Sequence, residues 1–308
     1  MITGYRFHET SWEEVTAGEE PDWLDLEKPE PDELAELASR LDLPPHFLTD
    51  PLDPRERPRL DDETGCFLII VRAPLIREDL QSCFETVPLG FIQTQGRILT
   101  ICREPGLVKQ FLSRQTRKPR RISGDSLIFK AFIEISTDFI HQLEVLEDLA
   151  EEAERHLSKS QHNDQIMTLL TIEKALINYS VALHSNRAIL EKLMSRVAFP
   201  LKEEQVDWLE RALTENQQAI FTVEIFGQIV GSMGDAFGVI ISNNLNKVMK
   251  FLTGVTIILM VPTLIVGAYG MNVSLPIAER WWAFYALSAL CLALSVAIWV
   301  FFYRKKWI

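Results

Sequence analysis

Two long uncharged runs near the C-terminus constrain the fold of this chain more than any other feature. No Asp, Glu, Lys or Arg occurs in residues 251–278 or in residues 281–303. Each run exceeds the roughly 20 apolar residues that a helix needs to cross a bilayer core about 30 Å thick. We therefore predict two transmembrane helices, at residues 250–272 and 281–303, joined by a short loop at residues 273–280.

Basic residues flank the predicted spans and indicate their orientation. Lys247 and Lys250 precede the first span, and a basic tail at residues 304–308 follows the second. Because cytoplasmic segments carry the excess of Lys and Arg, we expect both termini in the cytoplasm and the 273–280 loop outside. The N-terminus has no charged-then-apolar secretion signal, which also favours a cytoplasmic body. The expected location is the plasma membrane, or the inner membrane of a cell that has two.

The body of the chain is strongly acidic. Residues 246–308 hold six Lys or Arg against one Glu, a net charge of +5, and because the whole chain carries −12, residues 1–245 carry −17. This balance disfavours nucleic acid as a partner and suits divalent cations. The sequence also has no nucleophile–base signature, Walker loop or Gly-x-Gly-x-x-Gly motif, so we do not expect an enzyme.

Residues 1–125 predict a cytoplasmic α/β domain, because short β-branched and aromatic runs alternate with turn residues. The expected strands are residues 4–8, 23–26, 66–72, 87–94 and 97–102, with a helix at 31–41. The order of the strands cannot be inferred from this pattern.

Residues 126–249 predict long helices that form a cytoplasmic funnel or stalk. Stretches at 126–159 and 164–196 lack Pro and Gly and show helical apolar spacing. After Leu201 no proline occurs before Pro262, so the last stalk helix is expected to continue into the first span. A helix of about 70 residues at 1.5 Å each would be on the order of 100 Å long.

Small and weakly polar residues share one face of the first span, with Leu252 close beside them. They recur at steps of three and four: Asn246, Met249, Thr253, Thr256, Met260, Thr263, Gly267 and Gly270. Such a stripe suits a narrow conduit without fixed charges, which several copies of the chain would have to enclose. It suits close packing of helices equally well, and the sequence leaves both interpretations open.

The tripeptide Gly270-Met271-Asn272 lies between the two predicted spans. Glycine is expected to end the first helix, and the Asn272 side chain then places a neutral amide oxygen at the mouth of the membrane. Such an oxygen can replace or orient waters around Mg²⁺, which gives up its hydration shell reluctantly. The position of this motif therefore predicts an entrance for a hydrated divalent cation.

Taken together, these segments resemble the CorA family of divalent-cation channels, within a broader group of two-span Gly-x-Asn proteins. The matching segments are residues 246–253 (Asn-Lys-Val-Met-Lys-Phe-Leu-Thr), 262–272 (Pro-Thr-Leu-Ile-Val-Gly-Ala-Tyr-Gly-Met-Asn) and 304–308 (Arg-Lys-Lys-Trp-Ile), with 23–26 and 58–60 in the N-terminal domain. The resemblance implies an α+β membrane protein that forms a funnel-shaped homopentamer. Five first spans would line the pore, and the second spans would surround them.

The resemblance also implies a role for particular residues. At the mouth, Gly270, Met271 and Asn272 would form the selectivity ring, and Tyr269 would support it. Deeper residues would form two polar pore rings and a hydrophobic gate: Asn246 and Thr263 for the rings, Met249 and Leu252 for the gate. The tail residues would form a basic belt around the pore: Arg304, Lys305 and Lys306.

The function implied is uptake of Mg²⁺, with Co²⁺ and Ni²⁺ as further cargo, gated by cytosolic Mg²⁺ that is thus both transported and regulatory. Members of the family hold that regulatory ion on a stalk aspartate, but the corresponding position here is Arg211, so Asp235 and Glu224 are the remaining candidates. Two alternatives are a Zn²⁺ transporter of the same group and a membrane-anchored sensor that conducts no ion. Lipid, divalent cations and further copies of the chain are the expected partners.

Overall fold

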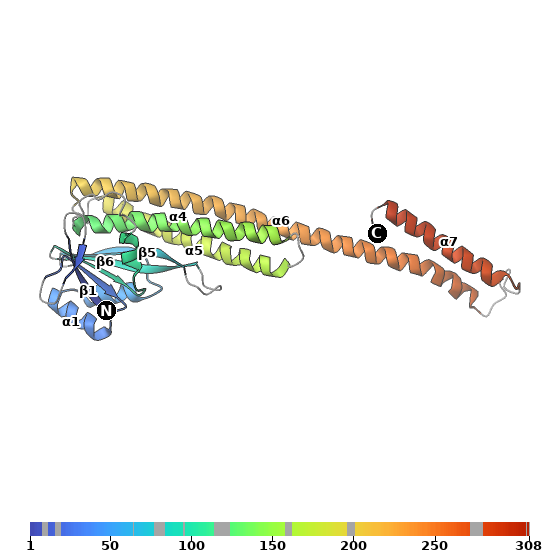
Figure 1. Ribbon diagram of the computed structural model, residues 1–308, viewed down its shortest axis with the longest axis horizontal. Coiled ribbons are helices and arrows are strands. Elements are labelled where there is room, and N and C mark those ends of the chain that lie inside the picture. The colour runs from blue at the N-terminus through green and yellow to red at the C-terminus, as the bar shows by residue number, and fades with distance from the viewer. Residues whose placement is uncertain are drawn as a thin grey trace. The chain divides into compact units, whose positions relative to one another are not determined.

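The computed structural model describes residues 1–7, 12–15, 20–63, 65–76, 84–94, 96–113, 124–157, 162–195, 201–271, 280–305 and 307. Its chain divides into two compact units, Met1–Ser232 and Met233–Ile308 (Figure 1). The helix α6 (Glu203–Tyr269) contributes to both units. The domain boundaries predicted from the sequence, at residues 125 and 249, stay predictions.

The first unit contains a mixed sheet of seven strands in the order β2-β1-β3-β7-β6-β5-β4. Its strands are β1 (Ile2–Phe7), β2 (Trp12–Glu14), β3 (Trp23–Glu27), β4 (Arg59–Glu63), β5 (Cys66–Ile76), β6 (Phe84–Thr94) and β7 (Arg97–Cys102). The central pair β3 and β7 is parallel, whereas each of the other neighbouring pairs is antiparallel.

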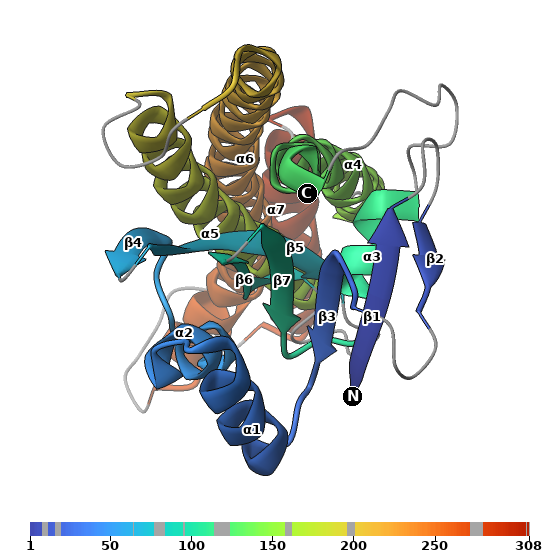
Figure 2. The same ribbon diagram turned by 90° about the vertical axis from the view of Figure 1, so that its left-hand side faces the viewer.

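Helices cover both faces of this sheet, as Figure 2 shows. On one face lie α1 (Pro31–Leu41) and α2 (Pro45–Thr49), followed by the short 3-10 turn η1 (Asp50–Leu52). On the other face lie α4 (Gly124–Leu157) and α5 (His162–Met194), with α3 (Leu107–Ser113) leading into α4. Because side chains alternate along a strand, each central strand contributes apolar residues to both layers.

The alternation can be followed on particular residues. Leu68 and Ile70 of β5 belong to the buried core that includes Leu34 of α1. On the opposite face, the Phe91 ring of β6 meets the Phe132 ring of α4 edge-on, with centroids 5.7 Å apart. The sheet is therefore the middle of three layers.

Three described helices are long and apolar enough to cross a membrane by length and composition: Asp164–Met194 within α5, α6, and α7 (Ala283–Arg304). The most apolar window of α5 is 39% buried inside the protein, against 6% for the windows of α6 and α7. Its buried side chains include Leu176 and Leu183, and the helix packs on β5 and β6. Its apolar residues therefore belong to the core of the first unit.

The α/β character of the N-terminal region and the long helices predicted from the sequence are confirmed. Each predicted strand exists, and helix α1 has the predicted bounds. Strands β2 and β4 and helices α2 and α3 were not predicted. In the second unit, α7 runs back alongside the end of α6 (Figure 1), and residues 272–279, which include Asn272, lie outside the described residues.

Candidate functional site

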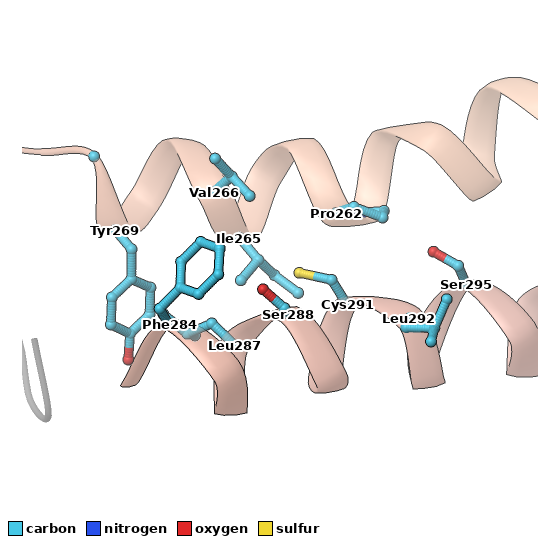
Figure 3. A pocket seen from close by; sticks show the side chains of 11 residues that line it. Pro262, Ile265, Val266, Tyr269, Phe284, Leu287, Ser288, Cys291, Leu292 and Ser295 are labelled. Carbon is cyan, nitrogen blue, oxygen red and sulfur yellow. The ribbon is translucent and has the colours of Figure 1, made fainter. Parts of the chain in front are cut away.

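The end of α6 has two faces with different surroundings. One face turns toward α7, and a cavity of about 630 Å³ lies between the two helices (Figure 3). Its lining includes Pro262, Ile265 and Tyr269 of α6, together with Phe284, Ser288 and Cys291 of α7. Figure 3 shows the Tyr269 ring pointing toward α7 beside Phe284. This face of α6 therefore packs against α7.

The opposite face of α6 is open in the single chain. It forms a shallow hollow of about 660 Å³, lined by Thr256, Leu259, Met260, Thr263, Leu264, Gly267, Ala268 and Met271. Four residues of the stripe predicted from the sequence lie together here: Thr256, Met260, Thr263 and Gly267. The open face of α6 is therefore the face on which the small and weakly polar residues gather.

The two threonines on the open face share one hydrogen-bond arrangement. The Thr256 hydroxyl donates to the carbonyl oxygen of Leu252, and the Thr263 hydroxyl donates to that of Leu259, both over 2.8 Å. A hydroxyl has one proton to donate and two lone pairs to accept with. Because the proton is occupied within the helix, each oxygen remains an acceptor on the open face.

The predicted gate and inner ring residues also lie on the surface of α6. Met249 is 53% exposed and Leu252 is 57% exposed, and Asn246 is exposed as well. Large apolar side chains with this exposure need cover from lipid or from another protein surface.

Helix α6 ends at the predicted motif. The Gly270 N–H donates to the Val266 carbonyl oxygen over 2.9 Å, and the Met271 N–H donates to the Ala268 carbonyl over 3.4 Å, so the last turn tightens. A Cβ atom at Gly270 would lie 3.3 Å from the Val266 oxygen. Gly270 lines the cavity toward α7, whereas Met271 lines the open face and is 60% exposed.

The basic tail ends α7. Arg304 and Lys305 are exposed, and Lys306 lies outside the described residues. Beyond them, the Trp307 N–H donates to the Phe302 carbonyl oxygen over 3.0 Å. The Trp307 ring stacks on the Phe302 ring, with centroids 5.2 Å apart. This contact holds Trp307 against its own helix.

Among the described residues of the single chain, the two candidate regulatory residues do not join a cluster of metal ligands. Glu224 Oε1 lies 3.3 Å from Nε2 of His184 on α5, and Asp235 is exposed on α6. Within the described part of the chain, no group of three or more His, Cys, Asp or Glu could hold a metal ion. Arg211, at the position that was expected to be acidic, lies over the Trp208 ring, 5.2 Å from its centroid.

A buried ionic cluster around β3 was not predicted from the sequence. Asp25 has no solvent exposure, and its Oδ1 accepts a hydrogen bond from the Thr100 hydroxyl over 2.7 Å. The Trp23 indole N–H donates to the same hydroxyl oxygen over 2.9 Å. Lys109 Nζ lies 3.0 Å from Glu27 Oε1 and 3.9 Å from Asp25 Oδ2.

Burial raises the pKa of Asp25 to about 6, against the opposing effects of the Thr100 hydrogen bond and the Lys109 charge. The signal in the sequence was an acidic residue between two apolar strand residues, Leu24 and Leu26. A charged group is rarely buried without a partner, so Asp25 could have been identified as a partnered interior residue.

Known proteins match the chain over most of its length. The family model described as "CorA-like Mg²⁺ transporter protein" matches residues 18–305. The chain is 30% identical over 296 residues to the cobalt/magnesium transport protein CorA of Methanocaldococcus jannaschii, covering 93% of this chain and 91% of that protein. It is 24% identical over 269 residues to the cobalt/magnesium transport protein CorA of Thermotoga maritima, covering 86% of this chain and 76% of that protein.

The fold also resembles solved structures. The complete structure of the CorA magnesium transporter from Methanocaldococcus jannaschii superimposes with a TM-score of 0.86 at 27% identity. The match covers 100% of this chain and 99% of that one. The chain is thus similar to one known structure along its full length.

Proposed function

Since the chain belongs to the family of CorA-like Mg²⁺ transporters, we propose that it takes up Mg²⁺ through a pore lined by α6 in a homopentamer. Divalent-cation transport follows from the family. The choice of Mg²⁺ over Co²⁺, Ni²⁺ and Zn²⁺, the pentamer and the role of each residue are parts of the proposal. In it, α6 and α7 are the two spans and both termini lie in the cytoplasm.

The open face of α6 is the observation that supports this proposal best. Its threonine hydroxyls present acceptors, and the uncharged run at 251–278 places no fixed charge beside them. Conduction needs sites that attract an ion yet release it. Neutral acceptors in contact with a hydrated Mg²⁺ satisfy both needs, because the ion keeps its water shell. The face toward α7 is already covered, which leaves the open face to line a path.

At the outer end, Gly270, Met271 and Asn272 would form the ring that admits the hydrated ion. Tyr269, which points toward α7, would hold this end of α6 against the second span. An amide oxygen from each copy at residue 272 would accept hydrogen bonds from the water shell of the ion. The ring would thus recognise the hydrated cation without removing its water.

At the inner end, Met249 and Leu252 would narrow the path and close it by excluding water, with Asn246 as a polar ring beside them. The belt of Arg304, Lys305 and Lys306 would surround this end. When cytosolic Mg²⁺ is abundant, it would bridge acidic faces of neighbouring copies and hold the gate shut, with Glu224 and Asp235 as candidate ligands. An inside-negative potential would contribute about 4.6 kcal/mol per 100 mV to the entry of a divalent ion.

Flux into liposomes tests the proposal. Purified protein is reconstituted, an inside-negative potential is applied, and Mg²⁺, Co²⁺ and Zn²⁺ entry are each followed with an indicator dye at two pH values. We expect Mg²⁺ entry that increases with the potential and is abolished by Asn272→Ala. The matched control is Ser288→Ala, whose hydroxyl lines the cavity between α6 and α7.

The same experiment separates the alternatives. Zn²⁺ flux that depends on a proton gradient, without Mg²⁺ flux, would replace the proposal with a zinc transporter. Unchanged flux in Asn272→Ala, together with loss of the oligomer on size-exclusion chromatography, would show that the motif serves assembly. No flux of any cation through the intact oligomer would favour a membrane-anchored sensor.

A further inference from the structure

A polar cavity in the first unit has a chemistry that cation transport does not require. It has a volume of about 670 Å³ and lies at the carboxyl ends of the parallel strands β3 and β7, where Lys28 and Arg103 follow the strands. The lining also includes Arg72 of β5, Thr86 of β6 and Asn178 of α5. Crevices at the carboxyl ends of parallel strands commonly bind small ligands, and such sites measure roughly 300–1,000 Å³.

Arg72 brings a positive charge to this cavity that only neutral oxygens contact. Its Nε donates to the Thr86 hydroxyl over 2.8 Å, its Nη1 to the carbonyl oxygens of Pro54 (3.2 Å) and Glu56 (2.8 Å), and its Nη2 to the Thr86 carbonyl. These bonds use four of its five N–H groups. Within the described residues Arg72 forms no ion pair, and burial lowers its pKa.

Lys28 and Arg103 add two more cations at the rim. The Lys28 N–H donates to the Cys102 carbonyl oxygen over 3.0 Å, which holds Lys28 beside the end of β7. Lys28 adopts a left-handed backbone with φ 42°, a conformation uncommon for a residue with a long side chain. Among the residues that the structure describes, neither Lys28 nor Arg103 takes part in an ion pair.

The charge balance of the cavity differs from that of its surroundings. Residues 1–245 carry −17, yet three cations converge here. The carboxylates of Glu85 and Glu104 also line the cavity, and both residues already have an interaction of their own. Three cations against two carboxylates leave the lining with a net positive charge, and an anion bound between the cations would reduce their mutual repulsion.

We propose that this cavity binds an anion that carries a polyphosphate group and has the size of a nucleotide. Guanidinium and ammonium groups form strong charge-assisted hydrogen bonds with phosphate oxygens. A volume of about 670 Å³ exceeds the need of one inorganic phosphate, so a larger ligand is required to fill it. The hydroxyl groups of a sugar suit the neutral polar part of the lining, where Thr86 and Asn178 lie, because hydroxyl and amide groups both donate and accept hydrogen bonds. This proposal does not rest on the transport function.

Calorimetric titration of the purified full-length protein in detergent tests this inference. The probes are ATP, inorganic tripolyphosphate and adenosine, in a buffer with chelator so that divalent cations do not compete. We expect ATP to bind, tripolyphosphate to bind more weakly, and adenosine to give no detectable heat. The variant Arg103→Ser should weaken ATP binding about tenfold or more, because it removes a charge-assisted contact with phosphate.

The matched control is Arg40→Ser. Arg40 is exposed on α1 and does not line the cavity, so this variant changes the net charge equally but should leave ATP affinity within about twofold. Arg103→Lys should retain most of the affinity. If Arg103→Ser fails to fold by circular dichroism, Lys28→Asn replaces it, because asparagine tolerates the left-handed backbone.

Three results decide the matter. Equal affinity for tripolyphosphate and ATP would support the phosphate chemistry and identify a free polyphosphate as the ligand. Absence of heat with both ATP and tripolyphosphate at millimolar concentration would overturn the proposal. Equal weakening by Arg103→Ser and Arg40→Ser would overturn it as well, because binding would then reflect overall charge.

Discussion

The side chain of Asn186 on α5 binds both backbone polar groups of Arg72 on β5. Its Nδ2 donates to the Arg72 carbonyl oxygen over 2.7 Å, and its Oδ1 accepts from the Arg72 N–H over 2.8 Å. Strand β4 pairs with β5 only as far as Arg59 opposite Ile70. Beyond Ile70, Asn186 therefore supplies the two hydrogen bonds that a longer β4 would have made.

Replacing Asn186 with Leu should destabilise the first unit. The change leaves a backbone donor and a backbone acceptor without partners at a site where Asn186 is 5% exposed, and each buried unsatisfied group costs about 1–3 kcal/mol. We expect a loss of about 2–4 kcal/mol, measured as faster amide hydrogen exchange of β5. Ser185→Ala is the control, since its exposed hydroxyl bonds only within α5. Equal exchange in the two variants would contradict this role of Asn186.

Asp25 should make the stability of the first unit depend on pH between about 4 and 6. Burial raises its pKa from the ordinary 3.8 to about 6, so in this range the folded state retains a proton that the unfolded chain releases. Stability then falls as pH rises through the range, by up to about 3 kcal/mol in total. Asp25→Asn should remove this slope.

The neighbours of Asp25 affect the stability outside pH 4.5–6. Burial opposes ionisation of Glu27, but hydrogen bonds from Lys109 and the Gly106 backbone leave its pKa below the ordinary 4.5. Its contribution is therefore present above pH 4.5 and lost as pH falls below that value. The pKa of Lys109 is raised, so it stays charged. The measurement is the difference in thermal midpoint between the unmodified protein and Asp25→Asn across pH 4.5–6. A difference that stays constant over this range would refute the prediction.

Lys130 of α4 should make the stability of the first unit rise with pH in the alkaline range, the opposite of the effect of Asp25. It is 3% exposed, and its Nζ lies 5.1 Å from the centroid of the Trp208 ring on α6. Burial lowers its pKa to about 8, although the Glu204 charge acts against this shift. Between pH 8 and 10.5 the unfolded chain therefore holds a proton that the folded state has released, and stability rises with pH.

Lys130→Met should abolish that rise and stabilise the protein below pH 8. Burying the ammonium costs desolvation free energy, and the cation–π contact offsets only part of that cost. We therefore expect the free energy of unfolding of the variant to be about 2 kcal/mol higher at pH 7. Thermal unfolding at pH 7 and pH 10 measures both effects. A variant that is less stable at pH 7 would show that the contact with Trp208 outweighs the desolvation of the lysine.

Several elements could be predicted because their signals are local. Helix α1 begins at Pro31 with Asp32 and Glu33 in its first turn, which is a typical helix start. The stripe on α6 could be predicted because steps of three and four keep residues on one side of a helix. Gly270, three residues beyond Gly267, departs from this stripe because it lines the cavity toward α7.

Other features depend on contacts between distant segments. Strand β4 has the sequence Arg-Leu-Asp-Asp-Glu, which shows no strand propensity and exists through its pairing with β5. The parallel pairing of Trp23 with Ile98 brings Lys28 beside Arg103, and nothing local predicts it. This polar cavity therefore could not be inferred from the sequence, whereas the shared face of the stripe on α6 could be.

Thr263→Val tests whether the open face of α6 meets the ion. Valine keeps the shape of threonine but removes the hydroxyl oxygen. That oxygen is an acceptor on the open face because its proton is donated to the Leu259 carbonyl oxygen. If hydrated Mg²⁺ passes along this face, its flux into liposomes should fall several-fold while the oligomer stays intact, because each copy loses one acceptor for the water shell. The control Ser288→Ala removes a hydroxyl from the face between α6 and α7 and should leave flux unchanged. Equal flux in both variants, with assembly altered only by Thr263→Val, would assign the stripe to helix packing.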